Sequence, residues 1–362
     1  MTQLKWHILR ATSLSILTAL VSWNCAFAQV PRQTPTTIQP SSDTDQVLPA
    51  SKVICGLIQG EFPSAKRIEL TSSAVGKDLC YIVFPPSEGS IKPTAGYPLL
   101  VLLHGLMGGP GDWIRFPKIV DRIHEAQQDP GISFPEIYVV LPLGKNGYWT
   151  NWNRSPKRWR DWVTHEVMKD LQVRFPDVSE RPEKRAIAGY SMGGFGALSI
   201  ALEYPGLFKH AVGLSPTDMD LAIQKKNQQR VYKRVFGKEL PLNRIHRYNP
   251  FHQVKRGLGK EQHFFLAFGS NEAPKFSDGG RRLTKEFERQ GIEVTSIEVP
   301  GGTHSFKSTW DKPVMESWIR WLGAIWSTPG EEAAPRNKKI PEGKVGKENL
   351  HRIKFENEEN KN

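Results

Sequence analysis

The chain has 362 residues, of which 38% are hydrophobic and 24% charged, and its formal net charge is +12 at pH 7. This composition supplies enough apolar material for one large core and excludes a chain that is disordered throughout. A basic balance is compatible with nucleic-acid binding, but the charge is scattered. Its densest run, residues 157–160, opens a helical pattern typical of a solvated face. We therefore expect no nucleic-acid partner.

The first 28 residues have the pattern of an export signal. Lys5 and Arg10 precede an apolar stretch over residues 14–23, and Ala26-Phe-Ala28 supplies the small residues of a cleavage site. The stretch is shorter than the roughly 20 residues that span a bilayer, which favours cleavage over a retained membrane anchor. We expect a mature protein that begins near Gln29 and is secreted or periplasmic, without a stable membrane anchor.

Cleavage would remove Cys25 and leave Cys55 and Cys80 as the only cysteines. Two cysteines in an exported chain indicate a disulfide, because secretory compartments are oxidising; two buried free thiols are the alternative. Neither cysteine has paired histidines at the spacing of a zinc site. We expect no metal and no cofactor.

Composition divides the rest of the chain into three parts. Residues 29–50 are rich in Pro, Thr, Ser and Gln, and residues 328–362 alternate Lys with Glu, so both are expected to be disordered. Residues 51–327 form the expected folded domain. Within it, residues 218–259 interrupt the pattern of strands and helices, and we expect an insertion that is either a lid over the active site or a pair of surface helices.

Apolar runs alternate with amphipathic helix patterns through the domain. Two strand-like runs, at 67–70 and 79–84, suit an antiparallel hairpin at a sheet edge. Six near-continuous apolar runs follow, as expected of parallel strands covered on both faces: residues 99–103, 137–141, 186–188, 211–214, 264–268 and 294–299. Helix patterns lie at 118–127, 158–174, 195–203, 279–290 and 315–326. The alternation predicts an α/β fold with a mostly parallel, doubly wound sheet and an antiparallel N-terminal edge.

Residues 189–193, Gly-Tyr-Ser-Met-Gly, match the G-x-S-x-G pattern of a nucleophile elbow. An apolar run precedes this segment and a helix pattern follows it, which is the context that the motif requires. Glycines flank the serine because a sharp turn brings the backbone close to its neighbours. Ser191 is therefore the candidate nucleophile, and a glycine-rich turn with an incidental serine is the alternative.

A serine nucleophile needs a histidine base that is oriented by a carboxylate, and α/β-hydrolases place them in the order Ser, acid, His. His304 follows the last predicted strand and is the candidate base. Glu272 lies close to the end of the run 264–268 and is the candidate acid. Asp278 and Asp218 are the alternative acids.

Acyl transfer also needs backbone N–H groups that meet the oxyanion of the tetrahedral intermediate. Met192, directly after the nucleophile, is one candidate donor. Leu106 is the other, in a loop that reads His-Gly-Leu-Met-Gly-Gly over residues 104–109. We expect His104 to brace this loop.

Four motifs in combination, at residues 102–106, 188–197, 204–208 and 301–306, resemble the esterase-D-like family of α/β-hydrolases. The most specific is the run Ser-Met-Gly-Gly-Phe-Gly-Ala over 191–197. That family includes S-formylglutathione hydrolases, feruloyl and acetyl-xylan esterases and secreted mycolyltransferases. The resemblance implies the α/β-hydrolase fold and a Ser191–His304 pair. Many members carry aspartate where this chain has Glu272, whereas the mycolyltransferases carry glutamate.

We expect an exported serine esterase that hydrolyses a small-molecule or carbohydrate ester through an acyl-enzyme on Ser191. Within the enzymes, the alternative is an acyltransferase that moves an acyl group to a carbohydrate hydroxyl. In another class, the alternative is a non-catalytic binding protein on the same fold. Three aromatic residues are possible substrate contacts unless they pack in the core: Tyr148, Trp149 and Trp152.

Overall fold

The computed structural model describes residue 55 and residues 62–132, 134–153, 155–225 and 229–327. The predicted export signal, leader and charged tail lie outside these residues. Within the described part of the chain, every helix is too short or too polar to cross a membrane.

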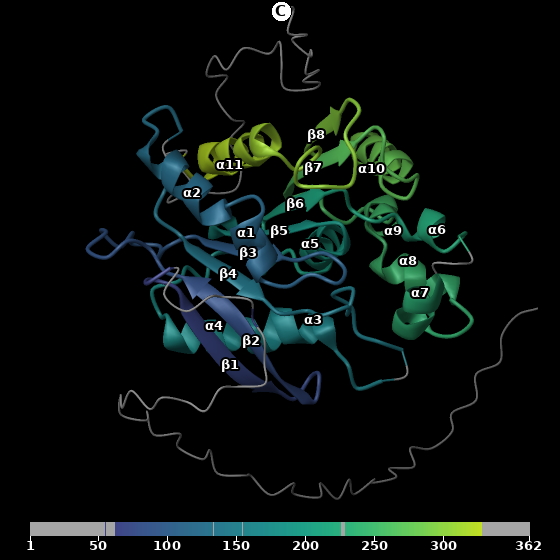
Figure 1. Ribbon diagram of the computed structural model, residues 1–362, viewed down its shortest axis with the longest axis horizontal. Helices are drawn as coiled ribbons and strands as arrows, with labels where there is room; N and C mark the ends of the chain where they lie inside the picture. Colours follow the sequence, from purple (N-terminus) through teal and green to yellow (C-terminus); the bar gives the residue numbers. More distant parts are fainter. Residues whose placement is uncertain (1–54, 56–61, 133, 154, 226–228, 328–362) are drawn as a thin grey trace, which may run out of the picture. The chain divides into compact units, whose positions relative to one another are not determined.

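One eight-stranded sheet runs through the domain (Figure 1). Its strands are β1 (Lys66–Ser72), β2 (Lys77–Phe84), β3 (Leu99–Leu103), β4 (Tyr138–Pro142), β5 (Arg185–Tyr190), β6 (His210–Leu214), β7 (His263–Gly269) and β8 (Val294–Val299). The spatial order is β1-β2-β4-β3-β5-β6-β7-β8. Strand β2 pairs antiparallel with both β1 and β4, and all other neighbours are parallel. The predicted mostly parallel sheet with an antiparallel N-terminal edge is confirmed.

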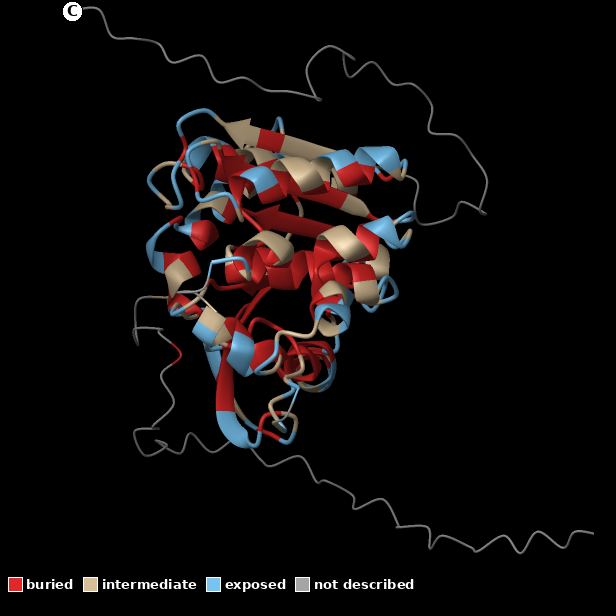
Figure 2. Cartoon of the chain, turned by 90° about the vertical axis from the view of Figure 1, so that its right-hand side faces the viewer, coloured by how far each residue is buried: buried red, intermediate tan, exposed pale blue. Residues whose placement is uncertain are grey.

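The burial of each strand follows its place in the sheet. Every residue of β3, β4, β5 and β6 is buried, which is why these strands are apolar without alternation. Strands β1 and β8 lie at the two edges, and many of their residues are half-exposed. Figure 2 shows the buried strands inside a shell of more exposed helices. The core therefore sits on both faces of the central strands.

Helices cover the sheet in two layers (Figure 1). They are α1 (Gly111–Arg115), α2 (Ile119–Gln128), α3 (Trp159–Asp161), the π-helix η1 (Trp162–Val167), α4 (Met168–Arg174), the 3₁₀-helix η2 (Pro182–Lys184), α5 (Met192–Glu203), α6 (Met219–Ala222), α7 (Gln229–Phe236), α8 (Leu242–Tyr248), α9 (Pro250–Lys255), α10 (Ser277–Arg289) and α11 (Lys312–Ser327). Helix α2 packs against α11, whereas α9 packs against α5 and α10.

The segment 158–174 differs from the single amphipathic helix, with a solvated basic face, that its sequence predicts. The helix passes through a π-turn, η1, between α3 and α4. Arg160 in α3 is only 1% exposed, so the predicted solvated face is wrong at this position. Its guanidinium pairs with Glu203, donates to Ser199 Oγ at 2.6 Å and stacks over the Tyr248 ring. These partners come from other helices, which the local charge pattern cannot reveal.

The described parts of the insertion at 218–259 contain four helices, α6, α7, α8 and α9, joined by turns and irregular segments. Tyr232 of α7 is buried, and its ring packs edge-on against Tyr148 at 5.5 Å. The Tyr232 hydroxyl also lies 3.5 Å from Lys275 Nζ. The insertion thereby adjoins the loop between β7 and α10.

Cys55 and Cys80 are joined by a disulfide, with their Cα atoms 6.0 Å apart. Both residues are buried. Because Cys80 lies in β2, the bond fastens residue 55 to the sheet near its antiparallel edge.

Candidate active site

Ser191 lies on a sharp turn between a strand and a helix. Strand β5 ends at Tyr190 and α5 begins at Met192, so Ser191 alone makes the turn, at φ 55° and ψ −117°. A non-glycine residue rarely adopts a positive φ, and such strain gathers at functional sites. The Ser191 amide donates to the Leu214 carbonyl of β6 at 2.7 Å, which holds the turn in place.

The two glycines of the motif are required by close backbone contacts. A Cβ on Gly189 would lie 2.2 Å from the Gly193 carbonyl oxygen, and a Cβ on Gly193 would lie 2.1 Å from the Leu103 carbonyl oxygen. Both distances are far shorter than any van der Waals contact. The turn can therefore form only with glycine at these positions.

His304 links the serine to a carboxylate. Its Nε2 lies 2.9 Å from Ser191 Oγ and its Nδ1 lies 3.1 Å from Glu272 Oε2. The imidazole stacks on Phe276, with ring centroids 3.9 Å apart, and meets the edge of Trp310 at 4.7 Å. These two aromatic rings fix the plane in which the imidazole can exchange protons.

The Glu272 side chain is fully buried and both of its oxygens have partners. Oε2 faces His304, while Oε1 accepts from Ser215 Oγ at 2.7 Å and from the Gly269 amide at 3.0 Å. The Ser215 hydroxyl in turn accepts from the indole N–H of Trp310 at 2.8 Å. The carboxylate is therefore held in one orientation.

The two alternative acids are engaged elsewhere. Asp218 pairs with Arg282 at 2.6 Å and accepts from Asn249 at 3.0 Å. Asp278 pairs with Arg281 at 2.8 Å. Neither carboxylate bonds to the imidazole, so the structure brings Glu272 to the position of the acid.

The two candidate oxyanion donors are the backbone amides of Met192 and Leu106. Met192 provides the first amide of α5, where the helix dipole favours negative charge. Leu106 lies in the loop that follows β3. Within the described part of the chain, neither amide donates a hydrogen bond to a protein acceptor. Both are thus available to a ligand oxygen.

His104 braces the oxyanion loop, as predicted. It is fully buried, and its Nε2 accepts from the Gly144 amide at 2.9 Å while Nδ1–H donates to the Gly105 carbonyl at 2.8 Å. Burial lowers the pKa of His104 to about 4. The ring is therefore neutral near pH 7 and acts as a fixed hydrogen-bonding spacer.

Asp112 ties the same loop to the elbow. Its Oδ2 accepts from the Tyr190 hydroxyl at 2.8 Å and from the Gly109 amide at 3.1 Å. Tyr190 directly precedes Ser191, so one carboxylate oxygen couples the nucleophile turn to the loop that carries Leu106.

Of the three aromatic residues proposed as substrate contacts, two are buried in the core and one is half-buried. Tyr148 is 3% exposed and Trp149 is fully buried, with its indole N–H donating to the His104 carbonyl at 3.3 Å. These two residues pack in the core behind the oxyanion loop, so core packing, the alternative to substrate contact, holds for them. Trp152 is half-buried and donates to the Gly147 carbonyl at 3.1 Å.

Sequence reasoning missed the residues that support the site. Ser215, Trp310 and Phe276 contact Glu272 or His304 but match no motif. Ser215 alone carried a signal, because it directly follows a buried strand beside the elbow strand, at the edge where parallel sheets place functional groups.

The strand order, the elbow after β5 and the acid and histidine after β7 and β8 define an α/β-hydrolase. The chain belongs to the esterase family, because a family model described as "Putative esterase" matches residues 72–320. The predicted resemblance is thereby confirmed, and the protein is a carboxylic-ester hydrolase by class.

Individual relatives agree with this assignment. An acetyl esterase from Caldicellulosiruptor saccharolyticus is 25% identical over 244 residues, which cover 62% of this chain and 83% of that one. An esterase from Mycobacterium tuberculosis is 28% identical over 235 residues, but they cover only 49% of its length and 58% of this chain. Among solved structures, an S-formylglutathione hydrolase from Agrobacterium tumefaciens shares the fold with a TM-score of 0.59 and 16% identity, covering 72% of this chain and 95% of that one.

Proposed function

We propose that this protein is an exported serine esterase that works through an acyl-enzyme on Ser191. The observation that carries the proposal is the continuous contact from Ser191 Oγ through His304 to the buried Glu272 carboxylate, at 2.9 and 3.1 Å. A serine hydroxyl becomes nucleophilic when an oriented base accepts its proton.

In the proposed first step, Ser191 Oγ attacks the ester carbonyl carbon while His304 Nε2 takes its proton. The carbonyl oxygen becomes an oxyanion, which the Met192 and Leu106 amides stabilise. The bond to the alkoxy group then breaks, and His304 gives its proton to the leaving alcohol. A water molecule repeats the sequence on the acyl-enzyme and releases the acid, while Glu272 stabilises the imidazolium each time.

Replacing the nucleophile tests this proposal. Ser191→Ala should lower kcat on a chromogenic acetyl ester by roughly 10⁴ to 10⁶, because the acyl-enzyme can no longer form. Acetyl esters are the first choice because one relative is an acetyl esterase. A fluorophosphonate probe should label the parent chain and the control Ser317→Ala, but not Ser191→Ala. A folded parent chain that takes no label would favour the non-catalytic binding protein.

The acyl-enzyme could also pass its acyl group to a sugar hydroxyl. The His304 side chain is 32% exposed, so an acceptor larger than water can approach the base. Product analysis with a carbohydrate acceptor separates the two activities. Free acid as the sole product supports the hydrolase, and an acylated sugar supports the transferase.

Export is a further part of the proposal. The basic start, apolar stretch and Ala26-Phe-Ala28 support it, and so does the Cys55–Cys80 disulfide, because such bonds persist in oxidising compartments. The mature chain from a bacterial host should be extracellular or periplasmic, and its N-terminal sequence should begin near Gln29. An intact N-terminus in the cytosolic fraction would contradict export without touching the catalytic proposal.

A further inference from the structure

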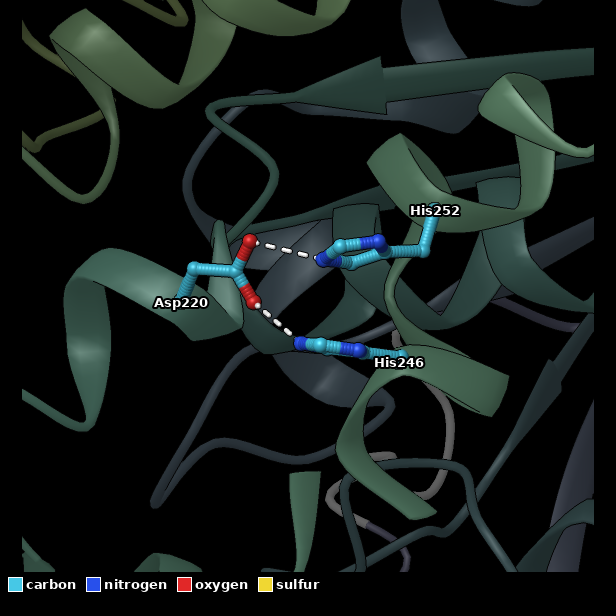
Figure 3. Close-up of side chains that lie close together, drawn as sticks. All are labelled: Asp220, His246 and His252. Atoms are coloured by element: carbon cyan, nitrogen blue, oxygen red, sulfur yellow. Dashed lines mark hydrogen bonds and ion pairs between the residues drawn. The ribbon is translucent and has the colours of Figure 1, made fainter. Parts of the chain in front are cut away.

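A cluster of metal-ligating side chains lies in the helical insertion, apart from the residues of the active site. It consists of Asp220 in α6, His246 in α8 and His252 in α9 (Figure 3). One ligand atom from each residue lies within 4.8 Å of the other two. None of the three contacts Ser191 or His304.

The three side chains converge on one point. His252 Nε2 lies 2.8 Å from Asp220 Oδ2 and His246 Nε2 lies 3.4 Å from Asp220 Oδ1, so each imidazole faces a different oxygen of the same carboxylate. Figure 3 shows the two rings lying nearly parallel, with the carboxylate facing one edge of each ring. Their centroids are 3.6 Å apart. An ion bound at this point would be ligated by the Nε2 atoms of both rings and by the carboxylate between them.

One atom of the cluster is unsatisfied. Asp220 Oδ1 is buried and accepts no hydrogen bond from the described residues. Its contact with His246 Nε2, at 3.4 Å, is an ion-pair contact and not a hydrogen bond. A buried carboxylate oxygen that accepts no hydrogen bond is costly, and a cation between it and the imidazoles would remove that cost. The other oxygen, Oδ2, accepts a hydrogen bond from the Arg282 guanidinium at 3.1 Å. That arginine is balanced by Asp218 at 2.6 Å, so its charge does not dominate the cluster.

Neutral imidazole and carboxylate are the ligands that zinc and its neighbours in the first transition row prefer. The side chains are 34%, 20% and 18% exposed for His246, Asp220 and His252, so an ion can reach them from solvent.

We propose that Asp220, His246 and His252 bind one divalent ion of the zinc class, with water completing its coordination. Helices α6, α8 and α9 have 4, 7 and 6 residues. Helices this short are unstable alone. The ion would fasten all three together, and its role is structural.

Zinc titration of the tag-free full chain, stripped with EDTA, tests the site. Calorimetry should show one equivalent bound, and zinc at about 100-fold above Kd should raise Tm by about 5 °C. Cobalt should give the visible absorption of a bound ion. Uptake of no zinc would overturn the proposal, and the cluster would then be an ion pair that shares protons.

Variants test whether these three residues bind the single equivalent of zinc. His246→Gln and the double variant His246→Ala, His252→Ala should lose it, whereas the exposed His124→Ala on α2 should keep it. The site should also persist in His304→Ala, because the active-site imidazole is a competing ligand. Circular dichroism of the metal-free proteins checks that each variant is folded. Zinc retained at one equivalent by a folded double variant would overturn the assignment.

Discussion

The acid of the site is decided by contacts between residues far apart in sequence. Glu272 is set by Ser215, 57 residues earlier, and by His304, 32 residues later. From the sequence, Ser191 and His304 could be proposed because a motif and a chain order mark them. The acid could not be chosen with the same security, because three carboxylates follow the right strands and only their burial and partners separate them.

The role of this carboxylate can be tested with an uncharged isostere. Glu272→Gln should lower kcat by roughly 10³ to 10⁴, because an amide cannot stabilise the imidazolium and can favour the wrong tautomer. The steady-state rate on an acetyl ester measures the loss. Asp278→Asn removes the rejected candidate, which pairs with Arg281 and with no other described residue, and should leave kcat within twofold. A larger loss in Asp278→Asn than in Glu272→Gln would reverse the assignment.

Elements were predicted well where burial leaves a direct mark on the sequence. All eight strands coincide with predicted apolar runs to within a few residues. Helix α5 begins at Met192, three residues before the predicted start at Phe195. Gly193 and Gly194 are poor helix formers, so the sequence predicts a helix that begins only after them. In the structure, tight packing against β3 and β6 holds both glycines in the helix.

Gly193, in the nucleophile turn, and Gly206, outside it, should respond very differently to substitution by alanine. Gly193→Ala should destabilise the fold by about 3 kcal/mol and lower kcat at least about 100-fold, because its Cβ would meet the Leu103 carbonyl at 2.1 Å and displace Ser191. Gly206 has open space around its Cα, so Gly206→Ala should change stability by less than about 0.5 kcal/mol. Urea unfolding and ester kinetics of both variants test the contrast. Equal stability of the two would show that the turn can absorb a methyl group.

At the scale of the whole molecule, the sequence predicted the sheet and an insertion at 218–259, but not how the helices of that insertion pack. Residues 218–259 carry mixed charges and short amphipathic pieces whose partners lie on α5 and α10. The convergence of Asp220, His246 and His252 depends on how three short helices pack. No spacing in the sequence marks it, since Asp220 and His246 are separated by 26 residues.

Two buried histidines make the fold sensitive to acid. Burial lowers the pKa of His104 to about 4 and that of His210 to about 3. In the unfolded chain each would take up a proton near pH 6.5. As the pH falls below 6.5, the unfolded state therefore gains protons that the folded state does not, and stability decreases.

This linkage gives a measurable pH dependence. Between pH 7.5 and 5.0 each histidine should remove about 2 kcal/mol from the free energy of unfolding. His210→Gln keeps a donor for the Glu183 carbonyl, which His210 Nε2 meets at 2.8 Å, but removes the titration. Its loss of stability over this range, measured by urea unfolding, should be smaller by about 2 kcal/mol. The exposed His124→Gln should behave like the parent, and an unchanged loss in His210→Gln would contradict the account.

The bracing of the oxyanion loop by His104 and Asp112 has a consequence for how the enzyme responds to temperature. The loop is ordered when the chain folds, so its loss of conformational entropy belongs to folding and not to catalysis. The logarithm of kcat should then follow one straight Arrhenius line up to the unfolding transition. Inactivation and global melting should coincide. A bend well below Tm would reveal a loop that melts on its own.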